Sequence, residues 1–275
     1  MVKLLSANFL RLIQDKIFRG GLILTAAWGV IVPVKRHMDA LQYDYTDEIE
    51  NGFLSYALFA GIVMAVFCSL FLGTEYNDGT IRNKIVVGGK RREIYLANTI
   101  VSSAAGLAMW AAYLLSYLCV GIPLTGAFTA DRKMLLLMGL TALLLTAAFT
   151  SIFTLIAMVC QNKAATAVIC ILLAFGSLMA GIVLNEMLDA PPTHPVYSLD
   201  DKGNMTSSEV PNPKYLEGVK KEIVQTIYDI NPGGQAIQCA ALTAANPLRL
   251  PLYSLAVMAL STGAGCVLFE KKDLK

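Results

Sequence analysis

The chain has 275 residues, of which 56% are hydrophobic and only 15% are charged, and its net charge is +2. A soluble domain carries about 25% charged residues. Here the charges gather in the gaps between long apolar runs, which excludes an ordinary soluble protein, and so small a net charge gives no reason to expect a nucleic-acid partner.

The first 16 residues are predicted to form an amphipathic helix. Leu5, Phe9, Leu12 and Ile13 recur with a period close to 3.6 residues, so they share one helical face. A helix with such a face lies on a membrane surface. The alternative that these residues simply extend the first membrane span stays open.

Six apolar stretches then follow, and a transmembrane helix needs about 20 such residues. The third and fourth are longer than a bilayer demands, which indicates tilt, and the first is interrupted by two glycines and a proline. The sequence therefore predicts one all-α polytopic domain over residues 1–275. The expected spans are 17–34, 53–72, 94–122, 134–160, 164–185 and 250–269.

The distribution of Lys and Arg predicts the orientation of these spans, because short cytoplasmic segments are enriched in both. Thirteen of the 22 basic residues fall in the N-terminal stretch, 73–93, 161–163 and the C-terminal tail. The segment 37–52 is acidic and has no Lys or Arg. We therefore expect both termini in the cytoplasm and the long segment 186–249 on the outer side.

The first half of segment 186–249, PPTHPVYSLDDKGNMTSSEVPNP, is rich in Pro, Ser and Asp and is predicted to be loop. The second half, KYLEGVKKEIVQTIYDI, has helical periodicity, and Asn231–Pro232–Gly233–Gly234 is expected to end that helix. The next run, QAIQCAALTAA, is too short to span a bilayer, so we expect it to dip into the outer leaflet or to pack on the bundle.

The segment 74–93, TEYNDGTIRNKIVVGGKRRE, is the longest predicted inner loop. Asp78 or Thr80 can cap a helix over 81–87, and Gly88 and Gly89 suit a left-handed stop. Such a short helix, with Ile81 and Ile85 on one face and cationic flanks, is suited to docking on another protein. The alternative is an ordinary basic loop whose side chains contact lipid phosphates.

This segment resembles the loop after the second span in permease subunits of type-2 ABC exporters. The matching residues are Glu75, Asp78, Gly79, Thr80, Ile81 and Arg82, followed by Gly88 and Arg91 or by Gly89 and Arg92. In that family the segment forms a coupling helix that contacts the ATP-binding subunit. The resemblance therefore implies partner contacts for Glu75, Asp78, Gly79, Thr80, Ile81, Arg82, Lys84, Arg91 and Arg92.

The resemblance also implies the rest of a complex. The chain lacks G-x-x-x-x-G-K-[ST], the phosphate-binding loop of ATPases, so ATP and Mg²⁺ are expected in two separate ATP-binding subunits and this chain is not expected to be an enzyme. A second permease, identical or related, would complete the translocation pathway. The expected location is the bacterial cytoplasmic membrane, in contact with lipid.

The interiors of spans two to six contain no Asp, Glu, Lys, Arg or His. Ion-coupled carriers usually place such residues there, and intramembrane proteases need His or carboxylates to activate their nucleophiles. This pattern favours movement driven by a partner, with an amphipathic or hydrophobic cargo such as a peptide, an antibiotic or a lipid-like molecule. A secondary carrier or a membrane scaffold remains the alternative.

Small residues recur every four positions on the fourth span, at Ala142, Thr146, Thr150 and Thr154. Such spacing lets helices approach closely, and a stripe that faces the substrate is the alternative. His37 and His194 lie in separate predicted outer loops, so no metal site is expected from them.

Overall fold

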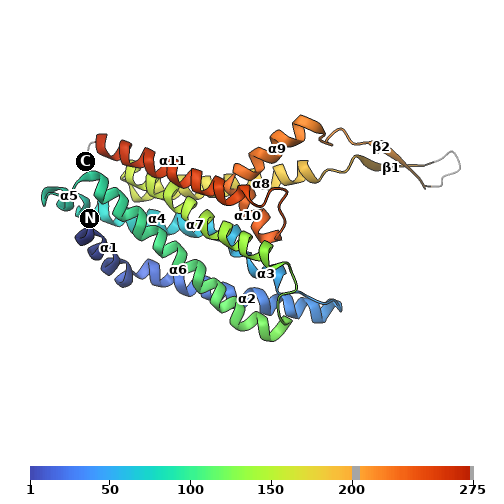
Figure 1. Cartoon of the computed structure of the whole chain (residues 1–275), viewed down its shortest axis with the longest axis horizontal. Coiled ribbons are helices and arrows are strands. Elements are labelled where there is room, and N and C mark those ends of the chain that lie inside the picture. Colours follow the sequence, from blue (N-terminus) through green and yellow to red (C-terminus); the bar gives the residue numbers. More distant parts are fainter. Residues whose placement is uncertain (200–204, 273–275) are drawn as a thin grey trace.

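The computed structural model describes residues 1–199 and 205–272, and most of them are helical (Figure 1). Within this described part, six helices are long and apolar enough to cross a membrane. The predicted all-α polytopic fold is therefore confirmed. The six are α2 (Lys16–Tyr43), α4 (Tyr56–Asn77), α6 (Arg91–Thr125), α7 (Arg132–Cys160), α8 (Lys163–Asp189) and α11 (Arg249–Lys271).

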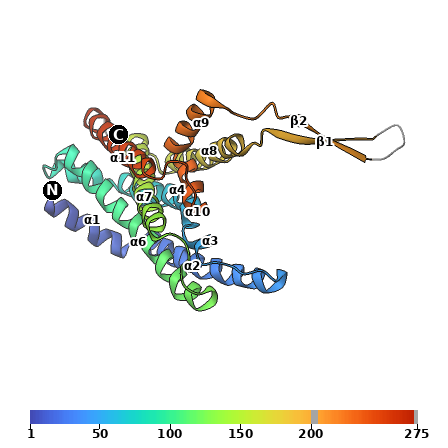
Figure 2. The ribbon, with the colours of Figure 1, turned by 45° about the vertical axis from the view of Figure 1, so that its right-hand side comes forward.

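Figure 1 shows these helices running along the long axis of the molecule, with both marked ends of the chain on its left. The short helix α5 (Thr80–Val86) lies at that same end. The hairpin of β1 (Thr193–Leu199) and β2 (Met205–Pro211) projects from the opposite end, as Figure 2 shows from a second side. The bundle thus has two distinct ends.

The N-terminal helix is separate from the first span. Helix α1 (Val2–Gln14) stops before Asp15, whose backbone is extended with φ −71° and ψ 130°. The Asp15 carboxylate accepts hydrogen bonds from the backbone N–H of Ile17 and Phe18, at 2.8 and 3.0 Å, and so caps α2. The alternative that residues 1–16 extend span one is wrong, because this cap starts a new helix.

The first span is longer than predicted. Helix α2 continues through Pro33 to Tyr43, whereas we expected it to end at residue 34. Arg36, near its end, pairs with Asp47 and donates from Nε to the Asp47 carboxylate at 3.0 Å. The last turns of α2 are therefore anchored on the segment before α3 (Glu50–Phe53), a single turn that leads into α4.

Helices α4 and α7 are the most buried of the six spans and form the centre of the bundle. The small residues of α7 face this core, since Ala142, Thr146, Thr150 and Thr154 are all buried. The hydroxyls of Thr146 and Thr150 donate to carbonyls one turn earlier in the same helix. Their burial supports helix packing over a stripe that faces the substrate.

The prediction of loop for the first half of segment 186–249 is wrong in part, because β1 and β2 form an antiparallel hairpin. Its register pairs Thr193 with Pro211 and Leu199 with Met205. The prolines favoured a loop because proline has no N–H to donate. Each strand of a two-stranded ribbon has one unpaired edge, however, and an edge accommodates proline.

The second half of this segment contains α9 (Gly218–Ile230) and α10 (Pro232–Ala241). The predicted break at Asn231 is confirmed, because its side chain caps α10 and also donates to the Ser177 carbonyl at 2.9 Å. Helix α10 packs on the bundle, with Gln235, Ala236 and Cys239 buried. Burial raises the pKa of the Cys239 thiol to about 12, so this thiol stays protonated at neutral pH.

Close contact between α10 and α8 depends on glycine. A Cβ atom on Gly233 would lie 2.0 Å from the carbonyl oxygen of Ser177, and one on Gly181 would lie 2.7 Å from the backbone nitrogen of Gly234. Since these neighbours are backbone atoms, they cannot rotate away. The glycines therefore let α10 lie directly against α8.

We predict that Gly233→Ala lowers the free energy of unfolding by roughly 1–3 kcal/mol, the usual cost of overpacking a tight interface. Thermal unfolding in detergent measures this loss. The matched control is Gly176→Ala on α8, where an added Cβ meets nothing within 4 Å, so its stability should be unchanged or slightly higher. Equal behaviour of the two variants would show that α10 does not sit on α8 in this way.

Candidate functional site

Residues 75–92, from the last turn of α4 to the start of α6, contain α5, and we call this segment the elbow. Gly79 precedes α5 with φ +67°, a left-handed conformation that glycine adopts without strain. The Thr80 hydroxyl donates to the Glu75 carbonyl at 3.1 Å and ties α5 back to α4. The predicted caps Asp78 and Thr80 are not used, because Gly79 is the N-cap and makes no side-chain cap. The predicted glycine stop is confirmed by Gly88, at φ +94°.

Glu75, in the last turn of α4, is buried and lies at the centre of this elbow. Its carboxylate forms ion pairs with Arg11 of α1 and Lys84 of α5. It also accepts a hydrogen bond from Nδ2 of Asn98 on α6, at 2.9 Å. Four helices therefore meet at one carboxylate.

Two further contacts close these interactions into a ring. Asn8 of α1 donates to Oδ1 of Asn98 at 2.7 Å and accepts from Nζ of Lys84 at 2.9 Å. Arg11 also donates to the Phe71 carbonyl and lies 4.0 Å from the centre of the Phe71 ring. We call Asn8, Arg11, Glu75, Lys84 and Asn98 the Glu75 network.

The charged side chains of the Glu75 network differ in their exposure. The Glu75 side chain is 0% exposed, while those of Arg11 and Lys84 are 27% and 15% exposed. A buried carboxylate is costly unless it is paired and hydrogen-bonded, and here both conditions are met. The carbonyls at the end of α4 add negative potential, which offsets the second cation.

The Ile81 face of α5 points into the chain itself. Ile81 is buried in a cluster with Ile94, Tyr95, Met158 and Phe269, and Ile85 packs against its rim. The opposite side of α5 is open: Arg82 and Asn83 are exposed, and Val86 and Val87 are 84% and 87% exposed. The surface that α5 offers to another molecule is therefore built from its last turn.

The structure divides the nine predicted partner-contact residues into three groups. Asp78 and Arg82 are exposed, and Gly79 and Thr80 are half-buried beside them. Glu75, Ile81 and Lys84 face inward and hold α5 on the bundle. Arg91 and Arg92 begin α6 and contact the end of α11: Arg91 donates to the carbonyls of Phe269 and Glu270, at 3.3 and 3.1 Å, and Arg92 pairs with Glu270.

Sequence reasoning missed Asn8, Asn98, Val86 and Val87, and it did not connect Arg11 with Glu75. Asn98 had a usable signal, because an amide inside an apolar span is expensive unless it has partners. The valines gave none, since their exposure depends on how α5 is turned. Among residues 1–199 and 205–272, no group of three His, Cys, Asp or Glu side chains is placed to hold a metal ion. The Glu75 network thus joins α1, α4, α5 and α6 through ion pairs and hydrogen bonds.

We predict that Glu75→Ala lowers the free energy of unfolding by about 2–4 kcal/mol. Removing one partner of a buried pair costs about 3–5 kcal/mol, and the partial exposure of Arg11 and Lys84 reduces that cost. Chemical or thermal unfolding in detergent measures it. Glu93→Ala is the control, because Glu93 makes only an exposed ion pair with the N-terminus and should have a far smaller effect. An equal loss in both variants would contradict a central role for Glu75.

Comparison with known proteins shows that the chain matches a protein family. The family model described as "ABC-2 family transporter protein" matches residues 27–199, which is more than half of the chain and includes the whole segment from Glu75 to Arg92. A search of curated proteins finds no significant match. Six membrane-spanning helices agree with the family's role as the membrane-spanning subunit of a transporter. The chain belongs to the ABC-2 family of transporter proteins.

Proposed function

We propose that this chain is the permease subunit of an ATP-driven exporter in the bacterial cytoplasmic membrane. Two ATP-binding subunits bind ATP and Mg²⁺ and dock on α5 from the cytoplasm, where both termini of the chain also lie. A second permease, identical or related, completes the translocation pathway. This assignment makes α5 the coupling helix and makes the hairpin end extracytoplasmic.

The observation that carries the proposal is the exposed last turn of α5. Val86 and Val87 lie next to each other at the end of the bundle that holds both termini, beside the exposed cation Arg82. That end has most of the chain's basic residues, so it faces water and lipid headgroups and not acyl chains. Two adjacent valines exposed there favour contact with a protein groove.

The Glu75 network supports a mechanism for coupling. A displacement of α5 is passed to α1 through Lys84 and Asn8, and to α6 through Glu75 and Asn98. The start of α6 is tied to the end of α11 through Arg91. Closure of the ATP-binding subunits therefore moves α1, α5 and the adjoining ends of three spans as one body, and this motion switches the pathway between inward-open and outward-open arrangements.

The composition of the spans supports a class of cargo. The interiors of spans two to six contain no Asp, Glu, Lys, Arg or His, which favours a pathway lined by apolar and hydroxyl groups. Such a lining suits an amphipathic or hydrophobic cargo, for example a peptide, an antibiotic or a lipid-like molecule.

The proposal predicts that Val86→Asp combined with Val87→Asp weakens binding to the ATP-binding subunit at least tenfold, which corresponds to about 1.4 kcal/mol. The two carboxylates replace the apolar contact and stay hydrated in the unbound state. Co-purification with the ATP-binding subunit encoded beside this chain, together with ATPase stimulation in vesicles, measures the loss.

Met205→Asp is the matched control, because Met205 is equally exposed but lies on the hairpin at the far end. Its binding should equal that of the unaltered chain. If the double variant co-purifies and stimulates normally, α5 is not the docking surface. If the unaltered chain captures no ATP-binding subunit, the exporter proposal fails and a secondary carrier or a scaffold takes its place.

A further inference from the structure

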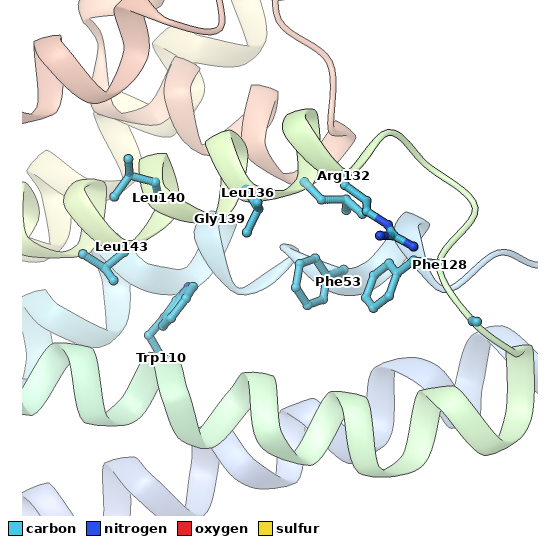
Figure 3. Close-up of a pocket in the computed structure, with 10 residues that line it drawn as sticks. Phe53, Trp110, Phe128, Arg132, Leu136, Gly139, Leu140 and Leu143 are labelled. Carbon is cyan, nitrogen blue, oxygen red and sulfur yellow. The ribbon is translucent and has the colours of Figure 1, made fainter.

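A groove of about 630 Å³ lies between α6 and α7, towards the hairpin end of the bundle. Trp110 of α6 and Leu136 and Leu140 of α7 line its length, and Phe53 and Phe128 close its outer end (Figure 3). Arg132, at the start of α7, is the one charged side chain that lines it within the described residues. The groove is therefore apolar along its length and cationic at one end.

The closed end of the groove is held in place by a buried carboxylate. Glu50 of α3 accepts hydrogen bonds from the backbone N–H of Thr129 and Ala130 and from the Thr129 hydroxyl, the last at 3.1 Å. These bonds fix the loop before α7. They set Phe128 edge-on to Phe53, with ring centres 4.9 Å apart. The groove is thus pre-formed and does not depend on a ligand for its shape.

Arg132 has no acidic partner within residues 1–199 and 205–272. Its neighbour Asp131 is occupied as the cap of α7, where its carboxylate accepts from the backbone N–H of Lys133 at 3.3 Å. Glu50 binds the loop through its Oε1 atom and forms no ion pair with Arg132. A guanidinium at one end of an apolar groove, with its charge not neutralised, complements an anionic headgroup joined to a hydrocarbon chain.

The open side of the groove indicates that such a ligand comes from the bilayer. Leu136 and Leu140 of α7 are exposed, so the groove opens on the side of the bundle, where acyl chains of a bilayer can enter it. Gly139 adds to the open space, because a Cβ there would meet nothing within 4 Å.

We infer that this groove binds a resident anionic phospholipid from the leaflet opposite α5. One acyl chain lies between α6 and α7 against Trp110, and the phosphate group accepts hydrogen bonds from Arg132. The lipid fills the space where the two spans diverge. This site is independent of the coupling proposal, which concerns the other end of the molecule.

Trp110 reports on the groove directly, because the chain has only two tryptophans. In a Trp28→Phe background, full-length protein is reconstituted in vesicles that contain either phosphatidylglycerol or phosphatidylcholine with brominated acyl chains, and quenching of Trp110 fluorescence is recorded. We expect half-maximal quenching at a mole fraction of phosphatidylglycerol about fivefold lower than that of phosphatidylcholine.

Two pairs of variants separate the site from general contact with lipid. Arg132→Gln should abolish the preference, whereas Lys133→Gln, one residue along and outside the groove, should keep it. Gly139→Leu should fill the groove and reduce quenching by either lipid, whereas Gly176→Leu, at an equally open position on α8, should not. Equal quenching by both lipids in the parent protein would overturn the inference. So would loss of the preference in Lys133→Gln, or absence of quenching because a second copy of the chain covers the groove.

Discussion

The carboxylate of Glu75 is buried at the end of α4, where it is compensated by Arg11 and Lys84 from two other helices. Neither α1 nor α5 is long enough to cross a bilayer. The shared carboxylate joins both helices to the spans, together with the buried side chains of Leu12 and Ile81. The direction of α5, the exposure of Val86 and Val87, and the position of α1 beside α6 all depend on this pairing.

Ion pairs and hydrogen bonds also connect the helices at the opposite end of the molecule, where the hairpin lies. Glu50 holds the loop before α7, Arg36 pairs with Asp47, and the hydroxyls of Tyr113 and Tyr117 donate to the carbonyls of Gly52 and Ile49, both at 2.7 Å. Between the two ends the helices pack through apolar and small side chains. The polar anchors therefore fix the connections at both ends of the bundle.

Hydropathy was sufficient to predict six spans, because an apolar run of about 20 residues has no other stable environment. The α5 helix could also be predicted, since Gly88 marks its end, but its start at Gly79 was not, because Asp78 and Thr80 offered themselves as caps and are not used. The β1–β2 hairpin could not, because pairing between Thr193 and Pro211 depends on contacts across 18 residues and prolines favour loops. Nor could the orientation of Ile81 towards the core, since Ile81 and Val86 are equally apolar and only the contacts of α5 with the rest of the bundle decide which one is exposed.

Hydrogen exchange of the amide protons in the unaltered chain and in Glu75→Gln, both in lipid nanodiscs, tests this dependence directly. The substitution keeps the size of the side chain and removes its charge. If Glu75 holds the elbow around α5 together, exchange should accelerate in α1 and α5 alike, while α10, packed against α8 at a distance from the network, keeps its protection. Faster exchange confined to α5, or unchanged exchange in both helices, would contradict the account.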